Sequence, residues 1–283
     1  EIEDYLAVLG SRERIMQIIS DELTEVRDQF AVPRRTEIVE WSGDMDDEDL
    51  IEREDMVVTV TSGGYIKRTP LADFRAQKRG GKGLSGGELK EDDVVTNLFV
   101  ANTHTPLLFF TTDGMVYKLK TWRLPQGGRT SKGKAIVNIL PIPTGVSVAA
   151  VLPIDRDEDH WDELQIVFAT TAGDVRRNQL SDFANVRSNG KIAMKLPEDG
   201  SVSMVNARIC TEDDDVMLVT DAGRAIRFRT TDVRVFKGRD STGVRGIRLS
   251  DGATVVSMAV IRHFEASAED RAAYLKMRRA VAG

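Results

Sequence analysis

The stretch of the chain best suited to binding chemistry is QKRGGKG at residues 77–83, where three cations and three glycines share seven positions. Such a segment is too polar to fill a core, and its glycines disfavour a helix. Glycine lets backbone N–H groups approach a phosphate closely, while neighbouring lysine and arginine side chains supply positive charge. The GGKG sequence lacks the spacing of a nucleotide-binding P-loop and the helix that should follow one. These residues therefore indicate a phosphate-binding loop without nucleotide hydrolysis.

Cations also recur at a fixed distance from four glycines that lie in predicted turns. These glycines are 50, 59 and 50 residues apart, at Gly64, Gly114, Gly173 and Gly223. The residue four positions after each of them is a cation: Arg68, Lys118, Arg177 and Arg227. A second cluster of glycines and cations follows in each unit, at residues 80–83, 128–134, 187–191 and 241–246.

The constant offset of these cations predicts a belt of positive charge. Successive side chains of a strand point to opposite faces, so repeating one cation per unit places basic groups at the same height on every rim. Neutralising the phosphates of a bent duplex would release counterions and supply sequence-independent affinity. The cations expected to bind DNA, apart from those at residues 77–83, are Lys67, Arg68, Lys118, Lys120, Arg129, Lys132, Lys134, Arg176, Arg177, Arg187, Lys191, Arg227, Arg229, Arg239 and Arg245.

Two other interpretations of the cations agree less well with the sequence. Surface strands can carry cations for solubility alone, but a fixed offset in a part of the chain with positive net charge favours binding. Single-stranded nucleic acid usually requires aromatic stacking platforms. We interpret Tyr65, Tyr117 and Trp122 as packing residues, so duplex DNA without base-specific reading is the predicted ligand.

No catalytic or metal-binding set is predicted in this chain. The three histidines, His104, His160 and His263, lie far apart without ligand spacing. The single cysteine, Cys210, excludes an internal disulfide and is expected in the core. The four tyrosines have no attendant acid cluster. We expect no cofactor to be bound by this chain.

The cations belong to a repeated strand–turn–strand pattern. The hairpins MVVTVTSGGYIKR, LLFFTTDGMVYKL, QIVFATTAGDVRR and VMLVTDAGRAIRF each place a glycine turn between apolar strands. Hairpin repeats of about 50 residues are typical of a β-propeller with four strands per blade. Residues 56–265 are therefore predicted to be mainly β, with four blades and no fifth hairpin. The polar insertion DRDEDHWDE is predicted to be an outer loop.

The two ends of the chain follow other patterns. Residues 1–32 show helical spacing of apolar residues, with a break at Gly10 and a predicted N-cap at Ser11. Residues 33–55 hold ten acids from Pro33 onward and are predicted to be a solvated linker, either a spacer or a competitor of DNA. Residues 266–283 are predicted to begin a helix at Ser267.

The acidity of the chain is confined to one end. The formal net charge is −6, yet residues 1–55 hold 18 acidic and 6 basic residues, which leaves a net +6 for residues 56–283. Attraction to a polyanion acts over about 8 Å in physiological salt, so the local balance matters more than the total. Apolar runs such as PLLFF are far too short to span a bilayer, and we expect a cytoplasmic, nucleoid-associated protein.

QKRGGKG resembles the seven-residue box QRRGGKG of the family formed by the A subunits of DNA gyrase, with Lys78 in place of one arginine. RRTEI in the linker, YIKRTPL in the first unit, LFVANTH and STGVRGIRL are also similar to that family, and together they span nearly the whole chain. The resemblance assigns the box to Gln77, Lys78, Arg79, Gly80, Gly81, Lys82 and Gly83.

The resemblance implies a gyrase-type, six-bladed β-propeller, or β-pinwheel, that wraps DNA around its rim. Four of the six blades would be present, preceded at 1–32 by the end of a coiled-coil arm. The chain would then be a piece of a longer protein, or a variant with an insertion at 266–283. It would serve a type II topoisomerase that introduces negative supercoils, yet be non-catalytic by itself. Partners would be double-stranded DNA, the gyrase B protein and a second copy of the gyrase A protein, with ATP and Mg²⁺ bound elsewhere.

Two alternatives to that family assignment are kept open. The corresponding C-terminal domain of topoisomerase IV generally lacks a full box, and the full-length enzyme would decatenate without supercoiling. A propeller that recognises proteins, of the kelch or WD type, would bind through loops at one face with weak salt dependence.

Overall fold

The structure, a computed structural model, describes residues 1–32, 36, 47–74, 93–238 and 241–282. The chain forms two compact units, Glu1–Asp46 and Asp47–Gly283. The first unit contains the helices α1 (Ile2–Gly10) and α2 (Arg12–Phe30). Ser11 Oγ accepts a hydrogen bond from Arg14 N at 3.3 Å, which confirms the predicted N-cap. The coiled-coil assignment of this unit stays a prediction.

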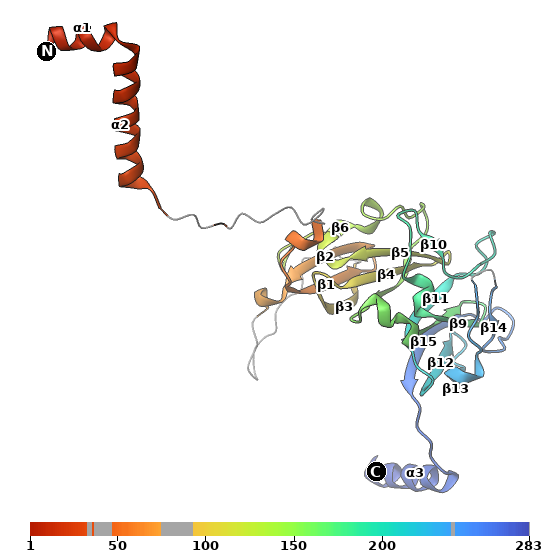
Figure 1. Ribbon diagram of the computed structural model, residues 1–283. Helices are drawn as coiled ribbons and strands as arrows, with labels where there is room; N and C mark the ends of the chain where they lie inside the picture. The colour runs from red at the N-terminus through yellow and green to blue at the C-terminus, as the bar shows by residue number, and fades with distance from the viewer. Residues whose placement is uncertain (33–35, 37–46, 75–92, 239–240, 283) are drawn as a thin grey trace. The chain divides into compact units, whose positions relative to one another are not determined.

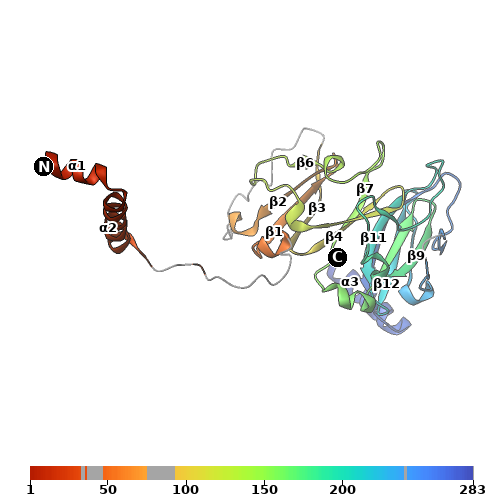
Figure 2. The same ribbon diagram turned by 45° about the horizontal axis from the view of Figure 1, so that its top comes forward.

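The second unit is built from four antiparallel sheets that follow one another in chain order (Figures 1 and 2). The first sheet has the order β3-β1-β2-β6 and the second β10-β5-β4-β7. Their strands are β1 (Asp55–Thr61), β2 (Tyr65–Pro70), β3 (Val95–Asn102), β4 (Pro106–Thr111), β5 (Met115–Lys120), β6 (Lys134–Ala135), β7 (Val148–Pro153) and β10 (Lys191–Ile192). The four hairpins predicted from sequence are all present in the unit.

The third and fourth sheets repeat this plan, with one difference. Their orders are β11-β8-β9-β14 and β13-β12-β15, so the fourth sheet has three strands among the described residues. The strands are β8 (Gln165–Thr170), β9 (Asp174–Gln179), β11 (Met204–Cys210), β12 (Asp214–Thr220), β13 (Ala225–Arg229), β14 (Val244–Arg245) and β15 (Val255–Arg262). The prediction of four strands per blade is therefore confirmed for three of the four sheets among the described residues.

Each four-stranded sheet receives one strand from the next unit along the chain. The short strand β6 follows the second hairpin, β4–β5, but pairs with β2 of the first sheet. In the same way β10 pairs with β5 and β14 with β9. We call β6, β10 and β14 the outer strands, because each forms the edge of its sheet opposite β3, β7 or β11. The last strands of the second to fourth sheets, β7, β11 and β15, contact one another in succession.

The outer strands are preceded by segments that we call the returning loops. These loops are residues 127–133, 185–190 and 236–243, the last with residues 239–240 outside the described part. Their described residues lead from each hairpin to the outer strand that pairs with the preceding sheet. Sequence analysis located the glycines and cations of these loops but missed the exchange of strands between neighbouring blades.

The cores lie between neighbouring sheets. One apolar cluster joins the first and second sheets, a second joins the second and third, and a third joins the third and fourth. In the middle cluster, Phe110, Phe168 and Phe183 form a triad of rings with centroids 5.3–5.8 Å apart. Trp161 is fully buried there, so the segment predicted as an outer loop is instead a 3-10 helix, Glu158–Glu163, anchored by its tryptophan.

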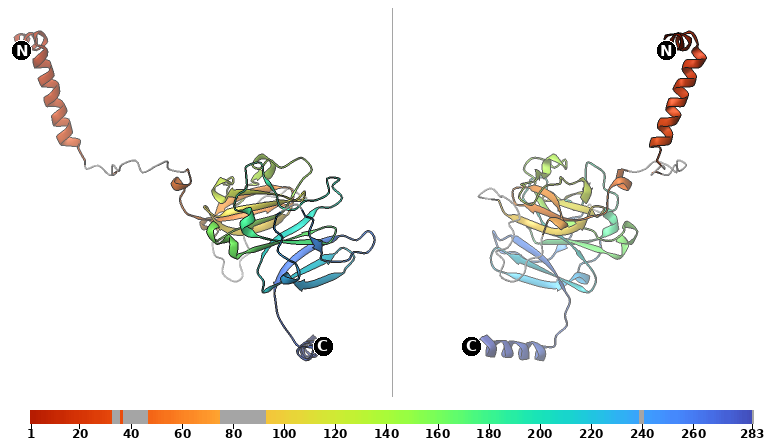
Figure 3. Two further views of the ribbon diagram at one scale, coloured as in Figure 1. Left: turned by 45° about the vertical axis from the view of Figure 1, so that its right-hand side comes forward. Right: turned by 90° about the vertical axis from the view of Figure 1, so that its left-hand side faces the viewer.

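After β15 the chain leaves the fourth sheet and forms α3 (Ala268–Ala282), visible beyond the sheets in Figure 3. Ser267 Oγ accepts from Asp270 N at 3.0 Å and donates to the Asp270 carboxylate at 2.7 Å, which confirms the predicted helix start. At the other end of this unit, residues 47–54 join the propeller through Thr103, whose Oγ1 donates to Glu52 O at 2.8 Å. No helix within the described residues is long and apolar enough to cross a membrane.

Candidate nucleic-acid interface

The predicted box, Gln77 to Gly83, lies outside the described residues, as does Arg239. Its place in the chain is nonetheless informative. The box follows β2 and the 3-10 helix Leu71–Asp73 and precedes β3. In the second, third and fourth units, the corresponding interval of sequence contains a returning loop. The box is therefore the first of four equivalent intervals in the order of the chain.

Three hairpin cations point inward, and the expectation that they face the rim is wrong. Lys67, Arg176 and Arg177 are buried, with exposed fractions of 4%, 0% and 5%. Lys67 Nζ donates to the carbonyl oxygens of Gly128, Arg129 and Ser131 at 2.6–3.2 Å. The physical reason is the exchanged segment, since a returning loop covers the side of the hairpin that the sequence pattern left open.

Arg176 is held by a returning loop in the same way, whereas Arg177 contacts a side chain of its own hairpin. Arg176 donates to the carbonyl oxygens of Gly238 and Ser241, the latter at 2.6 Å, and its guanidinium lies 5.4 Å from the centre of the Phe236 ring. Arg177 Nη1 donates to Gln165 Oε1 at 2.9 Å. These two cations are part of the packing of the third blade and are removed from the surface that DNA could touch.

Three other hairpin cations are half-buried and engaged. Arg68 Nε donates to Leu124 O at 2.9 Å, and burial lowers its pKa, an effect partly offset by Glu54. Lys118 pairs with Glu158 and lies 5.1 Å from the centre of the Trp161 ring. Lys120 pairs with Glu48 at 3.0 Å, so an acid from the predicted linker neutralises a cation that was expected to bind DNA.

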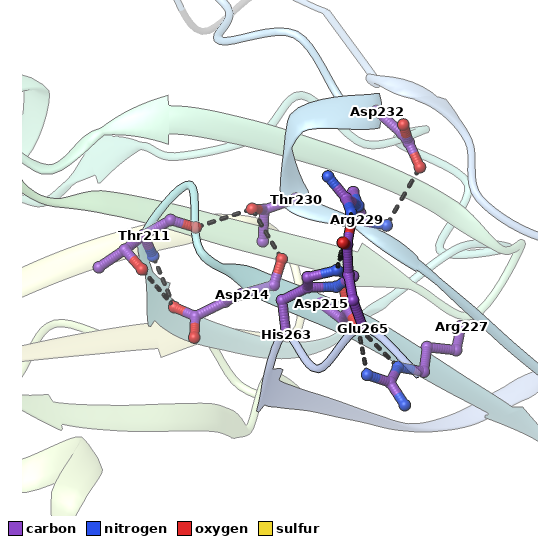
Figure 4. A network of polar contacts seen from close by, with 9 residues as sticks. All are labelled: Thr211, Asp214, Asp215, Arg227, Arg229, Thr230, Asp232, His263 and Glu265. Carbon is purple, nitrogen blue, oxygen red and sulfur yellow. Dashed lines mark hydrogen bonds and ion pairs between the residues drawn. The ribbon is translucent and has the colours of Figure 1, made fainter. Parts of the chain in front are cut away.

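The cations of the fourth blade, Arg227 and Arg229, enter a polar network around a buried carboxylate (Figure 4). Asp215 is 2% exposed and accepts from Arg227 Nε at 2.6 Å and from His263 Nδ1 at 2.8 Å. Arg229 Nη2 donates to His263 Nε2 at 2.8 Å and pairs with Glu265.

The pKa of Asp215 is set by its burial and by its hydrogen bonds, which act in opposite directions. Burial by itself would raise the pKa of the carboxyl, but hydrogen bonds and charge from His263 and Arg227 outweigh burial and leave the pKa below its ordinary value. The network thus ties the end of β15 to β12 and β13. Its geometry is that of a structural tie within the fourth blade.

Arg227 and Arg229 are exposed although they take part in this network. The other exposed cations among the predicted DNA-binding residues of the described part lie on the returning loops and outer strands. Lys134, Arg187 and Arg245 are exposed, and Arg129, Lys132 and Lys191 are half-buried. The ammonium of Lys132 lies 3.7 Å from the centre of the Tyr65 ring. Lys191 Nζ donates to Asp182 O and Asn185 O at 2.7 and 3.0 Å. Of the predicted DNA-binding residues in the described part, this second cluster is therefore the one that faces solvent at equivalent sheet edges.

Sequence reasoning missed three further exposed cations: Lys237 in a returning loop, and Lys195 and Arg248, which follow the outer strands β10 and β14 by three residues. A signal for two of them was present, because Lys195 and Arg248 each stand five residues after the last glycine of a returning loop, Gly190 or Gly243. With these residues, the second, third and fourth units each have three described cations within, or within three residues of, the returning loop and outer strand. Such a row of cations can neutralise the phosphates of one duplex.

Glycine allows the loops to lie against the hairpins. Gly133, Gly190 and Gly243 have φ angles of +86°, +83° and +97°, a region that other residues rarely adopt. A Cβ at Gly243 would lie 2.2 Å from the carbonyl oxygen of Val175, and one at Gly190 would lie 2.7 Å from the Tyr117 ring. These glycines fix the close approach of each loop to its sheet.

Four successive antiparallel sheets, three of them with an exchanged outer strand among the described residues, define a β-propeller. The profile of the family described as "DNA gyrase C-terminal domain, beta-propeller" matches residues 55–102, 105–155, 165–207 and 214–262, one segment for each sheet. The chain belongs to this family, which confirms the resemblance seen in the sequence.

Comparison with curated proteins gives the same family. The chain is 48% identical to the A protein of DNA gyrase from Granulibacter bethesdensis over 288 residues, covering all of the chain and 30% of the relative. It is also 48% identical to the A protein of DNA gyrase from Rickettsia bellii over 277 residues, covering 98% and 30%. The chain thus spans about 30% of the length of these relatives.

Solved structures share the fold. "Crystal structure of the C-terminal domain of DNA topoisomerase IV" aligns with a TM-score of 0.63 and 26% identity, covering 75% of this chain and 63% of that one. "Structure of DNA gyrase A C-terminal domain" aligns with a TM-score of 0.55 and 25% identity, covering 73% and 65%.

Proposed function

We propose that this chain binds duplex DNA along the outer edges of its blades and wraps it around them. The observation that carries the proposal is the position of Lys134, Arg187 and Arg245. These cations are exposed on an outer strand or on the loop before it, in three consecutive sheets. Phosphates are regularly spaced along a duplex, so a repeated edge of cations favours a sequence-independent contact. The box at residues 77–83 would extend this contact in the first unit.

The relatives support a wider proposal about the whole protein. We infer that the chain serves a gyrase, in which a wrapped segment with positive handedness lets strand passage introduce negative supercoils. The holoenzyme would combine two gyrase A proteins with two gyrase B proteins, would bind ATP and Mg²⁺ outside this chain, and would act in the cytoplasm on the nucleoid. The chain alone would be non-catalytic. The similarity to the curated gyrase A proteins is the ground for this assignment.

A second candidate is the C-terminal domain of topoisomerase IV, favoured by the TM-score of 0.63 with that solved structure. The box sequence QKRGGKG favours gyrase. Supercoiling assays with the full-length protein separate the two, because decatenation without negative supercoiling would identify topoisomerase IV.

The test of DNA binding is the salt dependence of affinity for a duplex of mixed sequence. With six or more phosphate contacts, the affinity is expected to fall at least about a thousandfold between about 50 and 200 mM salt. A nearly salt-independent affinity, or no binding at low salt, would overturn the proposal and favour a propeller that recognises proteins.

A further inference from the structure

The residue three positions after each turn glycine lies directly beneath a returning loop in the first three sheets. There these residues are Lys67, Tyr117 and Arg176, and all three are buried. A Cβ on the loop glycine would meet each of them: Gly133 would meet Lys67 Cβ at 3.1 Å, Gly190 the Tyr117 ring at 2.7 Å, and Gly243 Arg176 Cβ at 3.0 Å. In the fourth sheet the equivalent residue is Ile226, which is exposed.

The two cations at this position gather carbonyl oxygens of the loop above them. Lys67 Nζ donates to three loop carbonyls, those of Gly128, Arg129 and Ser131. Arg176 donates to the carbonyls of Gly238 and Ser241. Each loop therefore turns these carbonyl groups toward a buried positive charge.

This orientation has an electrostatic consequence on the outer side of the loop. The described peptide bonds are trans, and in a trans peptide the N–H points opposite to the C=O. Carbonyls that face Lys67 consequently direct the N–H groups of Arg129, Thr130 and Lys132 away from the ammonium. Carbonyl oxygens on the outer side would repel phosphate, whereas outward N–H groups and cations attract it.

We propose that Lys67 and Arg176 are positioning residues for DNA binding, which order the returning loops without touching DNA. The inference rests on the proposed function, because it assigns to these loops a role in phosphate contact. A positioning role explains why these two cations are buried close to the proposed DNA-binding surface. A cation that contacted DNA directly would be exposed there. Tyr117 fills the same position through packing, with its hydroxyl donating to Pro141 O at 3.2 Å.

The test compares Lys67→Met with a matched control, Arg208→Met, in the whole chain. Both variants remove one positive charge, but Arg208 is exposed on β11, away from the returning loops. Hydrogen exchange of the backbone amides at residues 127–134 is measured without DNA. Lys67→Met is expected to speed this exchange by about tenfold or more. Arg208→Met should leave it unchanged, and Lys67→Arg should restore much of the protection.

DNA affinity is then measured against salt for the same variants. One phosphate contact contributes about 0.9 to the slope of log affinity against log salt. Loss of loop order in Lys67→Met should lower this slope by more than that amount, even though the substitution removes only one charge, and a buried one. Arg208→Met should lower the slope by less than that. If Lys67→Met fails to fold, Lys67→Gln takes its place. It removes the charge and at least one of the three hydrogen bonds, so a smaller change in the same direction is expected.

Two results would overturn the inference. The first is unchanged exchange at residues 127–134 in Lys67→Met, which would mean that the ammonium does not order the loop. The second is faster exchange with an affinity and salt slope equal to the unsubstituted chain, which would mean that loop order is irrelevant to DNA. Absence of any salt-dependent binding by the unsubstituted chain would instead refute the proposed function, and this inference with it, while the exchange data would still report on loop order.

Discussion

Arg227 reaches across the hairpin of the fourth blade to the buried carboxylate of Asp215, with a distance of 2.6 Å between Nε and Oδ2. Arg177 makes the equivalent contact with Gln165 in the third blade, and Arg68 lies 3.8 Å from Met56 Sδ in the first. In each case the partner is the residue eight positions before the turn glycine. The regular spacing of these cations therefore reflects a repeated structural contact within the blades.

Substitution of Arg227 should accordingly affect stability more than DNA binding. Arg227→Met leaves Asp215 with His263 as its remaining side-chain donor among the residues drawn in Figure 4. We expect a loss of about 1–2 kcal/mol in the free energy of unfolding, because a buried carboxylate loses a charge-assisted hydrogen bond. Urea unfolding measures this loss. Introducing Asp215→Asn into the variant should recover part of it, and a variant of full stability with greatly weakened DNA binding would contradict the interpretation.

The same carboxylate predicts a pH dependence of stability. The pKa of folded Asp215 is below its ordinary value, so its ionised form stabilises the fold above the pKa of the unfolded state, near about 4. This contribution is lost as the pH falls through the lower, folded-state pKa. The free energy of unfolding should therefore decline more steeply on acidification in the unsubstituted chain than in Asp215→Asn. Parallel curves for the two proteins would show that Asp215 does not contribute in this way.

Cys210 should be unreactive in the folded protein. Its side chain is buried, and burial raises the pKa of the thiol to about 12, so very little thiolate is present at neutral pH. An aromatic disulfide reagent should label it slowly in buffer and rapidly in denaturant. Rapid labelling of the native chain would indicate that the edge between β8 and β11 opens readily.

The box residues Lys78, Arg79 and Lys82 should be required for wrapping. Neutralising all three is expected to abolish the topoisomer shift produced by ligase closure of a nicked circle. Stability should change little, because surface substitutions usually alter the free energy of unfolding by only about 0.5 kcal/mol. Circular dichroism and thermal unfolding provide the control for folding. A full topoisomer shift with the triple variant would show that the box is not required for wrapping.

Much of the fold could be predicted from the sequence because its signals are local. The turn glycine at residue 114, the apolar strands on either side and the caps at Ser11 and Ser267 each act within a few residues, and the structure contains all of them. The exchange of outer strands is a contact between distant segments, such as Lys134 with Ile66, and has no local signal. The family resemblance supplied the propeller class but not this detail.

The lack of a local signal also explains the error in the candidate site. The alternation of side chains correctly separates the two faces of β2, but it does not reveal that a loop from the next unit covers Lys67. Lys67 was therefore expected at the rim. In the structure its partners are instead carbonyl oxygens about 60 residues further along the chain. The second cluster was predicted from glycine and cation spacing, and its exposure agrees with that expectation.

The central claim, that DNA is held by the returning loops and outer strands, is tested most directly by topoisomer shifts of two triple variants. One variant replaces Lys134, Arg187 and Arg245 by glutamine, and the control replaces Lys120, Arg208 and Arg229, which removes the same charge away from the returning loops. The unsubstituted chain and the control are expected to shift the linking number equally, whereas the outer-edge variant is expected to produce no shift. A normal shift with the outer-edge variant, or an equal loss with the control, would contradict the claim.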